Sequence, residues 1–304
     1  MVTCATAAHA QAPAGWPEFR YAVSAAQDAV TKGRIPEPPR QEELRRDDVF
    51  RVKTVEVTPG ELVEEQPVGE YDQPLWTTFR RFPSTRVYLQ TPPGGVQFEQ
   101  WFELRKKKDR RGDDETRLRQ ELEFGLGNRM QLDLYLRESH VRDGVDSTFE
   151  MTGYSAELRY ALADWDEIWG NPTLYFEWIF NDGDADKIEP KLLLGGELAR
   201  GWHWGVNFIH ERTLAGRDSR TEEEAVTASI SRTVIDNKFS VGATSAFSYE
   251  SEPGTPRERT REWLLGPSFQ LIPHPRAAIN LEPLWGLTAE SKRLKLFVVF
   301  SWHF

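Results

Sequence analysis

Ionisable side chains occupy alternate positions over long stretches of residues 96–304. Arg117, Arg119, Glu121 and Glu123 form one such run. Because successive side chains of a β-strand point to opposite faces, a period of two places these charges on one face. Such a face can line an aqueous pore and set its ion selectivity, or it can pair Arg against Glu and fill a narrow lumen. The complete set of candidate lining residues is Glu99, Glu103, Arg105, Arg117, Arg119, Glu121, Glu123, Asp133, Arg137, Glu157, Arg159, Glu177, Lys191, Glu197, Glu211, Glu282 and Lys295.

The same residue types give little support to enzyme or metal chemistry. His210 is followed by Glu211 and Arg212, without the serine of an H-x-S arrangement, so no nucleophile is paired with a base. The carboxylates form a continuous lining rather than an isolated acid/base pair. The sequence therefore predicts no catalytic residues, no metal site and no cofactor. No H-x-x-H or H-E-x-x-H spacing occurs among the six histidines, which are His9, His140, His203, His210, His274 and His303.

Twelve strands are expected to carry these side chains. The face opposite the charges is apolar, as at Leu118 and Leu122. Strands that are apolar on one face and charged on the other, separated by turn residues, are typical of a transmembrane β-barrel. Pro190, Pro267 and Pro283 fall on the apolar face, where a missing N–H is costly in lipid, so bulges or shifted strand ends are expected there. The expected ranges are 96–106, 115–126, 129–139, 149–162, 172–181, 187–198, 202–213, 223–234, 238–250, 260–271, 276–287 and 293–304.

The connections between these strands alternate in length. Tight turns such as Arg200-Gly201 and Asp236-Asn237 alternate with longer polar connections such as 139–148. Outer-membrane barrels combine short periplasmic turns with longer external loops, so both chain ends of the barrel are expected at the periplasmic side. Aromatic side chains are expected at the two membrane interfaces. They gather at Trp165, Trp169, Trp202, Trp204, Trp302 and Phe304 on one side and at Trp178, Tyr249, Trp263 and Trp285 on the other.

The last expected strand is apolar at every second position. Leu294, Leu296, Val298, Phe300, Trp302 and Phe304 share one face. This segment resembles the terminal strand of Gram-negative outer-membrane β-barrels, which commonly ends in Phe after alternating apolar residues. The resemblance implies that Phe300, Trp302 and Phe304 form a signal for the barrel-assembly machinery. We expect this strand to pair with 96–106 and close the barrel.

Composition bounds the remaining possibilities. The chain has 304 residues, a formal net charge of −10 and a mean hydropathy of −0.58. The acidic balance argues against a nucleic-acid partner, and no run of 18 apolar residues predicts a transmembrane helix. A transmembrane barrel needs only alternate residues to be apolar, so its average hydropathy looks soluble. Among the candidate lining residues, acidic side chains outnumber basic ones, which predicts that an open pore would favour cations over anions.

The first 95 residues lack the regular alternation of residues 96–304, which form the expected barrel. Residues 1–10 look like the tail of a secretory signal, because they end in the A-x-A pattern Ala8-His9-Ala10, and they contain the only cysteine, Cys4. Residues 11–95 are interpreted as a periplasmic segment that can pack into the barrel mouth as a plug. Its expected parts are a short helix within 11–35, a Pro-rich linker at 36–48, a strand at 49–58 and clustered aromatics at 59–95.

Small hydroxyl side chains on the inward face of 223–234 and 238–250 leave room for a solute path or for an inserted segment. Four further stretches are W-T-T-F-R-R-F-P-S-T-R-V-Y-L-Q-T-P-P-G-G-V-Q at 76–97, R-Y-A-L-A-D at 159–164, N-P-T-L-Y at 171–175 and K-L-L-L-G-G-E-L at 191–198. They resemble a group of poorly characterised, transporter-like bacterial outer-membrane proteins. That resemblance implies an outer-membrane barrel but carries no catalytic or binding residue.

The sequence thus predicts an all-β, up-and-down transmembrane barrel of about twelve strands in the outer-membrane lipid. Its predicted function is that of a passive channel or porin-like transporter for small solutes, and its oligomeric state stays open. The alternative is a closed barrel that serves as a structural anchor or assembly partner through its periplasmic segment or its external loops.

Overall fold

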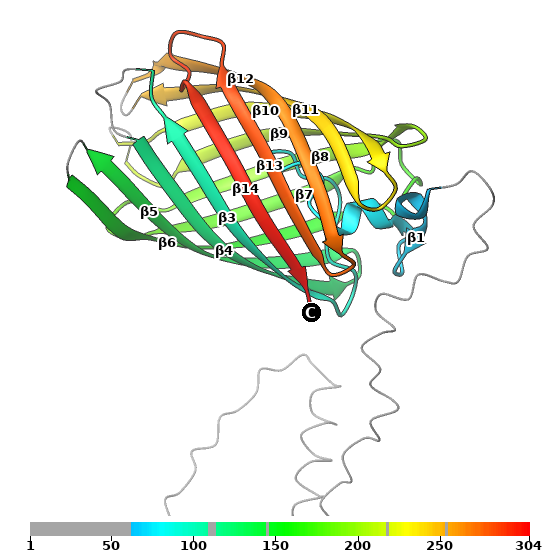
Figure 1. Cartoon of the computed structure of the whole chain (residues 1–304). Coiled ribbons are helices and arrows are strands. Elements are labelled where there is room, and N and C mark those ends of the chain that lie inside the picture. The colour runs from blue at the N-terminus through cyan, green and yellow to red at the C-terminus, as the bar shows by residue number, and fades with distance from the viewer. Residues whose placement is uncertain (1–61, 109–113, 144–145, 217–218, 253–254) are drawn as a thin grey trace, which may run out of the picture. The chain divides into compact units, whose positions relative to one another are not determined.

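The computed structural model describes residues 62–108, 114–143, 146–216, 219–252 and 255–304. Twelve antiparallel strands, β3 to β14, follow one another around a closed barrel, and β14 pairs with β3 (Figure 1). The prediction of twelve strands is confirmed. The strands are β3 (Val96–Lys106), β4 (Asp114–Gly127), β5 (Met130–Asp143), β6 (Asp146–Ala161), β7 (Thr173–Asn181), β8 (Lys187–Ala199), β9 (Trp202–Thr213), β10 (Glu222–Ile235), β11 (Phe239–Glu252), β12 (Thr255–His274), β13 (Ala277–Gly286) and β14 (Leu294–His303).

Short elements precede the barrel. They are the 3-10 helix η2 (Val63–Glu65), the two-residue strands β1 (Pro67–Val68) and β2 (Gln73–Pro74), and the 3-10 helix η3 (Leu75–Thr78). The expected signal remnant, the helix within 11–35, the linker at 36–48 and the strand at 49–58 lie outside the described residues. No helix in the described ranges is long and apolar enough to span a membrane.

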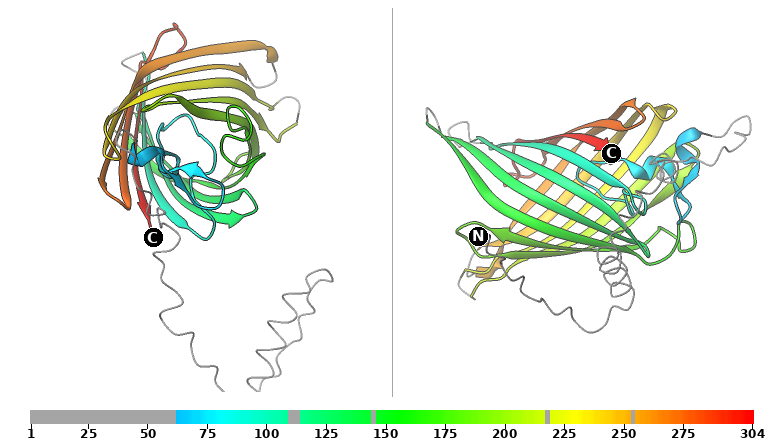
Figure 2. Two further views of the ribbon diagram at one scale, coloured as in Figure 1. Left: turned by 90° about the vertical axis from the view of Figure 1, so that its right-hand side faces the viewer. Right: turned by 90° about the horizontal axis from the view of Figure 1, so that it is seen from below.

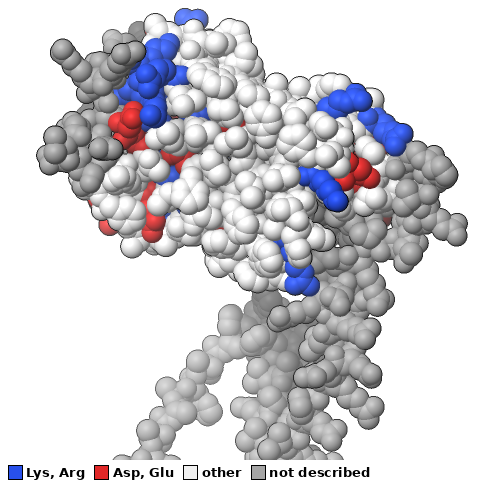
Figure 3. Space-filling view, viewed as in Figure 1, with Lys and Arg blue, Asp and Glu red and all other residues white. Residues whose placement is uncertain are grey.

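The outward face of the barrel is apolar. Large side chains such as Phe102, Leu174 and Leu265 are each more than 40% exposed, as is expected where lipid replaces water. Figure 3 shows a broad band without charged side chains across the barrel, with Lys, Arg, Asp and Glu gathered toward its two ends. On a closed barrel, which leaves no unpaired strand edge, such a band is a membrane-embedded surface.

The expected closing strand closes the barrel. β14 pairs with β3 from Leu294 opposite Lys106 to His303 opposite Gln97, and the Phe304 backbone N–H donates to the Val96 carbonyl at 3.1 Å. Phe304 is 57% exposed on the outward face. The even-numbered residues of this strand therefore face lipid, and its odd-numbered residues face the lumen.

The prolines are accommodated by gaps in the ladder rather than by the expected bulges. Between β12 and β13 the ladder stops after Leu265 opposite Trp285 and resumes at Phe269 opposite Leu281 in unchanged register. That register places Pro267 opposite Pro283, and neither ring nitrogen can donate a hydrogen bond. Pro190 likewise falls in an in-register gap between β8 and β9. The expectation of bulges at these prolines was wrong, because the strands lose pairs without shifting.

The two ends of the barrel differ. One end, called here the short-turn end, carries the tight turns, in which Gly201 and Asn237 have positive φ values of 70° and 50°. The other, the long-loop end, carries the longer connections, such as that between β13 and β14. Residues 62–95, called here the luminal segment, begin at the rim of the short-turn end and enter the barrel from there (Figure 2). Backbone N–H groups of Val63 and Glu64 donate to the Asp236 carboxylate there, at 2.8 and 3.2 Å.

Aromatic residues seal the luminal segment at this end. Trp165, in the connection between β6 and β7, is buried with its ring edge-on to Trp76 and Tyr88, at centroid distances of 5.8 and 5.3 Å. Sequence analysis placed Trp165 at the membrane interface together with Trp169. Only Trp169, which is 80% exposed, is free to lie there. The prediction for Trp165 was wrong because an aromatic surface on the luminal segment competes for it.

Candidate functional site

The lumen is the candidate functional site, and Arg80 of the luminal segment lies at the centre of its acidic part. The Arg80 Nη2 atom lies 2.6 Å from Glu99 Oε2, 3.3 Å from Glu121 Oε1 and 3.2 Å from Glu123 Oε1. Arg80 and all three carboxylates are nearly inaccessible to solvent. A buried carboxylate needs a partner charge or hydrogen-bond donors. One side chain from the luminal segment therefore compensates three carboxylates from two strands.

Arg86 makes a second set of contacts further along the segment. Its Nη2 atom lies 3.0 Å from Glu121 Oε1, 3.5 Å from Glu157 Oε2 and 2.5 Å from the Tyr135 hydroxyl. Arg159 of the barrel wall contacts Glu157 as well, and it pairs with Asp133 at 2.7 Å. Five buried carboxylates of β3 to β6 are thus held in one continuous network with arginines from both the wall and the luminal segment: Glu99, Glu121, Glu123, Asp133 and Glu157.

Backbone groups of the luminal segment are satisfied by amide side chains of the wall. Asn207 Oδ1 accepts from the Arg86 N–H, and Asn207 Nδ2 donates to the Arg86 carbonyl, both at 2.7 Å. Gln270 and Asn280 donate to the Arg80 carbonyl at 2.9 and 2.6 Å. Because buried backbone groups must be paired, these amides replace the ladder partners that an irregular segment lacks. The wall therefore recognises the backbone of this segment as well as its charges.

The small side chains on the inward face of the barrel wall contact the luminal segment. The Thr85 hydroxyl lies 3.1 Å from that of Thr227 and 2.8 Å from that of Ser229. A β-carbon on Gly195 or Gly205 would lie only 2.5 or 2.7 Å from a methyl group of Val87, so these two paired glycines form a notch for that side chain. The space beside these small residues was expected to hold either a solute path or an inserted segment. In the structure it holds the luminal segment.

Three clusters of side chains could offer ligands to a metal ion: Glu65 with Glu197 and His203, Glu99 with Glu121 and Glu123, and Glu121 with Asp133 and Glu157. The two acidic clusters are already compensated by Arg80, Arg86 and Arg159. In the cluster of Glu65, Glu197 and His203, Arg81 Nη2 donates a hydrogen bond to His203 Nδ1 at 2.8 Å, because arginine has no acceptor atom. The proton of the neutral ring is therefore on Nε2, the atom that faces Glu65 at 3.6 Å, and that atom has no lone pair for a metal.

Glu65 and Tyr88, which both lie outside the strands, have raised pKa values. Burial raises the pKa of Glu65, whose carboxylate accepts a hydrogen bond from the Gly201 backbone N–H. Burial also raises the pKa of Tyr88, whose hydroxyl donates to the Ala163 carbonyl at 2.8 Å. Tyr88 therefore remains a donor at physiological pH and ties the luminal segment to the connection between β6 and β7.

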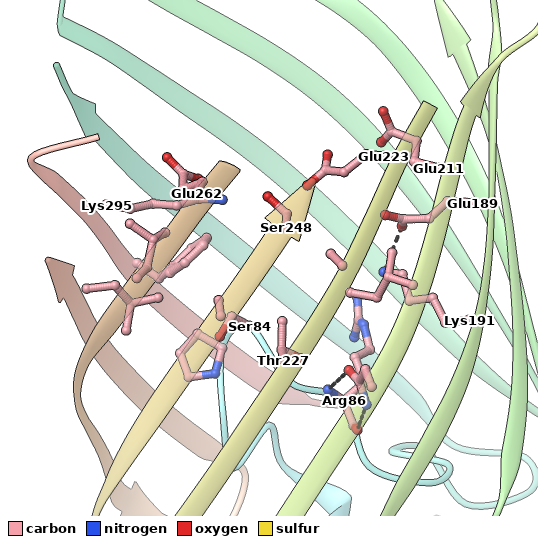
Figure 4. A pocket seen from close by; sticks show the side chains of 18 of the residues that line it. Ser84, Arg86, Glu189, Lys191, Glu211, Glu223, Thr227, Ser248, Glu262 and Lys295 are labelled. Atoms are coloured by element: carbon pink, nitrogen blue, oxygen red, sulfur yellow. Dashed lines mark hydrogen bonds and ion pairs between the residues drawn. The ribbon is translucent and has the colours of Figure 1, made fainter. Parts of the chain in front are cut away.

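A cavity of about 250 Å³ separates the luminal segment from the long-loop end (Figure 4). At roughly 30 Å³ per water molecule it holds about eight waters. Figure 4 shows Arg86 rising from the luminal segment below Glu189, Glu211 and Glu223, which belong to the wall. A second cavity of about 220 Å³ shares several of these residues and continues to Lys292, in the connection between β13 and β14. Water-accessible space thus extends from the luminal segment toward the long-loop end.

All seventeen candidate lining residues belong to strands of the barrel, but they fall into three environments. Glu197 lies at the short-turn end, where its Oε1 atom accepts from Trp76 Nε1 at 3.0 Å. One group is buried at the depth of the luminal segment: Glu99, Glu121, Glu123, Asp133, Glu157, Arg159 and Glu282. The other lines the cavity or pairs with a residue that does: Glu103, Arg105, Arg117, Arg119, Arg137, Glu177, Lys191, Glu211 and Lys295.

Sequence reasoning missed the partners of the buried carboxylates. Arg80, Arg81 and Arg86 all lie within the stretch W-T-T-F-R-R-F-P-S-T-R that precedes the barrel. Arginines between buried aromatic residues are expected to meet carboxylates, because a buried guanidinium also needs partners. That interleaving of basic and aromatic residues was the available signal.

A closed antiparallel barrel with an apolar outer band and a polar lumen defines a transmembrane β-barrel of the outer-membrane type. No protein-family model and no curated protein matches the sequence. Among solved structures, an outer membrane channel from Pseudomonas putida F1 is similar over 71% of this chain and 98% of its own, with a TM-score of 0.55 and 12% identity.

Two porins are more distant. The NanC porin covers 68% of this chain and 98% of its own, at a TM-score of 0.48 and 12% identity. The KdgM porin, solved in complex with disordered oligogalacturonate, covers 68% of this chain and 99% of its own, at 0.48 and 9% identity. At these identities the likeness to the Pseudomonas channel shows a shared fold, and the two porins carry no argument about substrate.

Proposed function

We propose that this protein is an outer-membrane channel for small solutes, without enzymatic activity, whose lumen is closed at the short-turn end by residues 62–95. The observation that carries the proposal is the charged, water-accessible cavity that ends on the luminal segment. Conduction through this lumen requires the luminal segment to move or to leave. We further propose that the short-turn end faces the periplasm, that the barrel-assembly machinery reads the terminal strand, and that residues 11–95 belong to the periplasmic side.

A closed barrel that acts as an anchor is the second candidate function. The hydrogen bonds and ion pairs of Arg80, Arg81 and Arg86 support it, because each is buried and each fixes the luminal segment to the wall. Breaking a buried ion pair by removing one partner costs about 3–5 kcal/mol, so a segment with several such pairs leaves the lumen slowly. The two functions therefore differ in one requirement: a channel must release or move the luminal segment in order to conduct, and an anchor need not.

A reversible cross-link separates the two functions. The Thr85 and Ser229 hydroxyl oxygens lie 2.8 Å apart, so Thr85→Cys with Ser229→Cys brings two thiols within reach of a disulfide. Cys4→Ser in the same chain removes the only native thiol. In planar bilayers, the channel function predicts that oxidation lowers conductance and that a reducing agent restores it to the level of the Cys4→Ser single variant.

Deletion of residues 62–91 provides the matched positive control for this measurement. A chain that conducts neither with the luminal segment nor without it would contradict the channel function and favour the anchor. Equal conductance in the oxidised and reduced forms would show that solutes pass without movement of the luminal segment near Thr85.

A further inference from the structure

In the cavity between the luminal segment and the long-loop end, Arg119 and Arg137 form no ion pair with any carboxylate of the described residues. Seven basic side chains line it: Arg86, Arg105, Arg117, Arg119, Arg137, Lys191 and Lys295. Five acidic side chains do so: Glu177, Glu189, Glu211, Glu223 and Glu262. The accessible part of the lumen is therefore basic, although the whole chain is acidic. We propose that Arg86, Arg119 and Arg137 bind a small oxyanion, a phosphate or carboxylate group, in this cavity.

The register places Arg119 and Arg137 directly opposite each other. They are Cα partners on β4 and β5, so their β-carbons are about 4.5–5.5 Å apart on the lumen side. Like charges in directly opposite positions destabilise a sheet unless something lies between or beside them. Among the residues that the structure describes, neither guanidinium forms an ion pair with a carboxylate. A bound anion would relieve this repulsion.

Unsatisfied donors point to the same place. The Nη1 atoms of Arg86 and Arg137 are buried and have no hydrogen-bond partner among the described residues, although both residues line the cavity. Arg86 is itself only 8% exposed, and its Nη2 atom is held by Glu121. A buried donor left unpaired is unfavourable, so these two atoms favour the binding of a ligand that can accept a hydrogen bond.

Trp101 holds two of the three arginines near each other. The Arg119 Cζ atom lies 4.5 Å and the Arg86 Cζ atom 5.9 Å from the centroid of its ring. Arg86, Arg119 and Arg137 all line the cavity of about 250 Å³, which has room for a small ligand.

The carboxylates that line this cavity are mostly engaged elsewhere. Glu189 pairs with Lys191 at 2.7 Å, and Glu211 pairs with Lys187 at 2.6 Å. Glu177 accepts from Ser155 and Tyr175, each at 2.6 Å, and Glu262 accepts from the Lys292 backbone N–H at 2.9 Å. Within the described part of the chain, none of these side chains forms an ion pair with Arg119 or Arg137, although Glu177 and Glu211 lie close enough to act on Arg137 electrostatically. An oxyanion suits the site, because planar guanidinium groups bind phosphate and carboxylate oxygens in bidentate geometry.

Calorimetric titration of the folded full chain in detergent micelles tests this inference, with inorganic phosphate in one arm and acetate in the other. Ionic strength is held constant with sodium chloride, so that general screening does not change. We expect saturable binding of at least one of the two anions. Arg119→Gln and Arg137→Gln should each weaken it about tenfold, and the double variant should show none.

Arg232→Gln is the matched control. It removes the same charge from another arginine over a tryptophan, since the Arg232 Cζ atom lies 5.3 Å from the Trp202 ring, but Arg232 is exposed on the outward face. Binding by this variant should equal that of the original chain. Heat-modifiable gel mobility establishes folding, and Arg137→Lys, which keeps the charge but not the bidentate geometry, should bind with intermediate strength.

Two results would overturn the inference. One is the absence of saturable binding of either anion to the original chain, and the other is equal binding by the original chain, Arg119→Gln, Arg137→Gln and Arg232→Gln. Because the readout is binding, it is independent of conduction. A chain that binds phosphate but never conducts would leave this site in place and contradict the proposed channel.

Discussion

The lumen has two halves that differ in how their charged side chains are paired. The filled half contains residues 62–95, and the open half contains the cavity. In the filled half, Arg80, Arg86 and Arg159 lie among five buried carboxylates, which are Glu99, Glu121, Glu123, Asp133 and Glu157. In the open half, Arg119 and Arg137 face each other, and within the described ranges neither is paired with a carboxylate. The filled half thus has more carboxylates than guanidinium groups, whereas the cavity of the open half is lined by more basic than acidic side chains. The charge that a solute does meet is set by which part of the wall the luminal segment covers.

The difference between the two halves affects the expected preference of an open pore for cations over anions. That expectation assumed that all seventeen lining residues face one aqueous path, and the preference stays a prediction for a barrel from which the luminal segment has moved. With the segment in place, the accessible cavity is lined by more basic than acidic side chains. A change in ion preference on displacement of the segment would therefore accompany any change in conductance.

The largest difference between the two halves should appear in stability. Arg80→Gln leaves Glu99, Glu121 and Glu123 without their shared guanidinium, which should lower the free energy of unfolding by about 3–5 kcal/mol. Arg119→Gln removes the same charge from the open half, where it relieves repulsion with Arg137, so it should change that free energy by less than about 1 kcal/mol. Urea unfolding in lipid vesicles, followed by heat-modifiable gel mobility, measures both. Equal losses in the two variants would contradict the distinction between the halves.

A smaller effect should follow from steric crowding in the filled half. A β-carbon on Gly205 would lie 2.7 Å from Val87 Cγ2 and 3.0 Å from Thr85 Cγ2. Gly205→Ala should therefore lower the free energy of unfolding by about 1–3 kcal/mol, as overpacking commonly does. Val87→Ala in the same chain removes the clashing methyl groups and should recover most of the loss. If the double variant were as unstable as the sum of its single variants, Val87 would not be the neighbour that Gly205 accommodates.

The sequence predicted the barrel well, because a period of two over twelve strands is a strong local signal. The range 202–213 is reproduced without change, and 260–271 is only extended, to Thr255–His274. It could not predict that Trp165 would be buried, because its partners Trp76 and Tyr88 are distant in sequence. Nor could alternation separate Arg119 from Glu121, which share a face yet lie in different halves of the lumen. Depth along the barrel axis depends on what fills the lumen, and strand periodicity does not contain that information.

The smallest expected effect concerns Glu65, at the mouth of the filled half. Burial raises its pKa above the ordinary value of 4.5, so the folded state binds the proton more tightly than the unfolded state does. Stability contributed by the protonated group is therefore present below about pH 4.5 and is lost as pH rises through the raised pKa. Glu65→Gln cannot ionise, and its amide oxygen can still accept the Gly201 N–H. Urea midpoints at pH 4 and pH 7 should show the variant gaining on the original chain as pH rises. A constant difference between the two chains would mean that Glu65 is solvated in the folded barrel, and a difference that favours the original chain more at pH 7 would mean that the fold stabilises its ionised form. Either result would contradict the assignment of Glu65 to the sealed half.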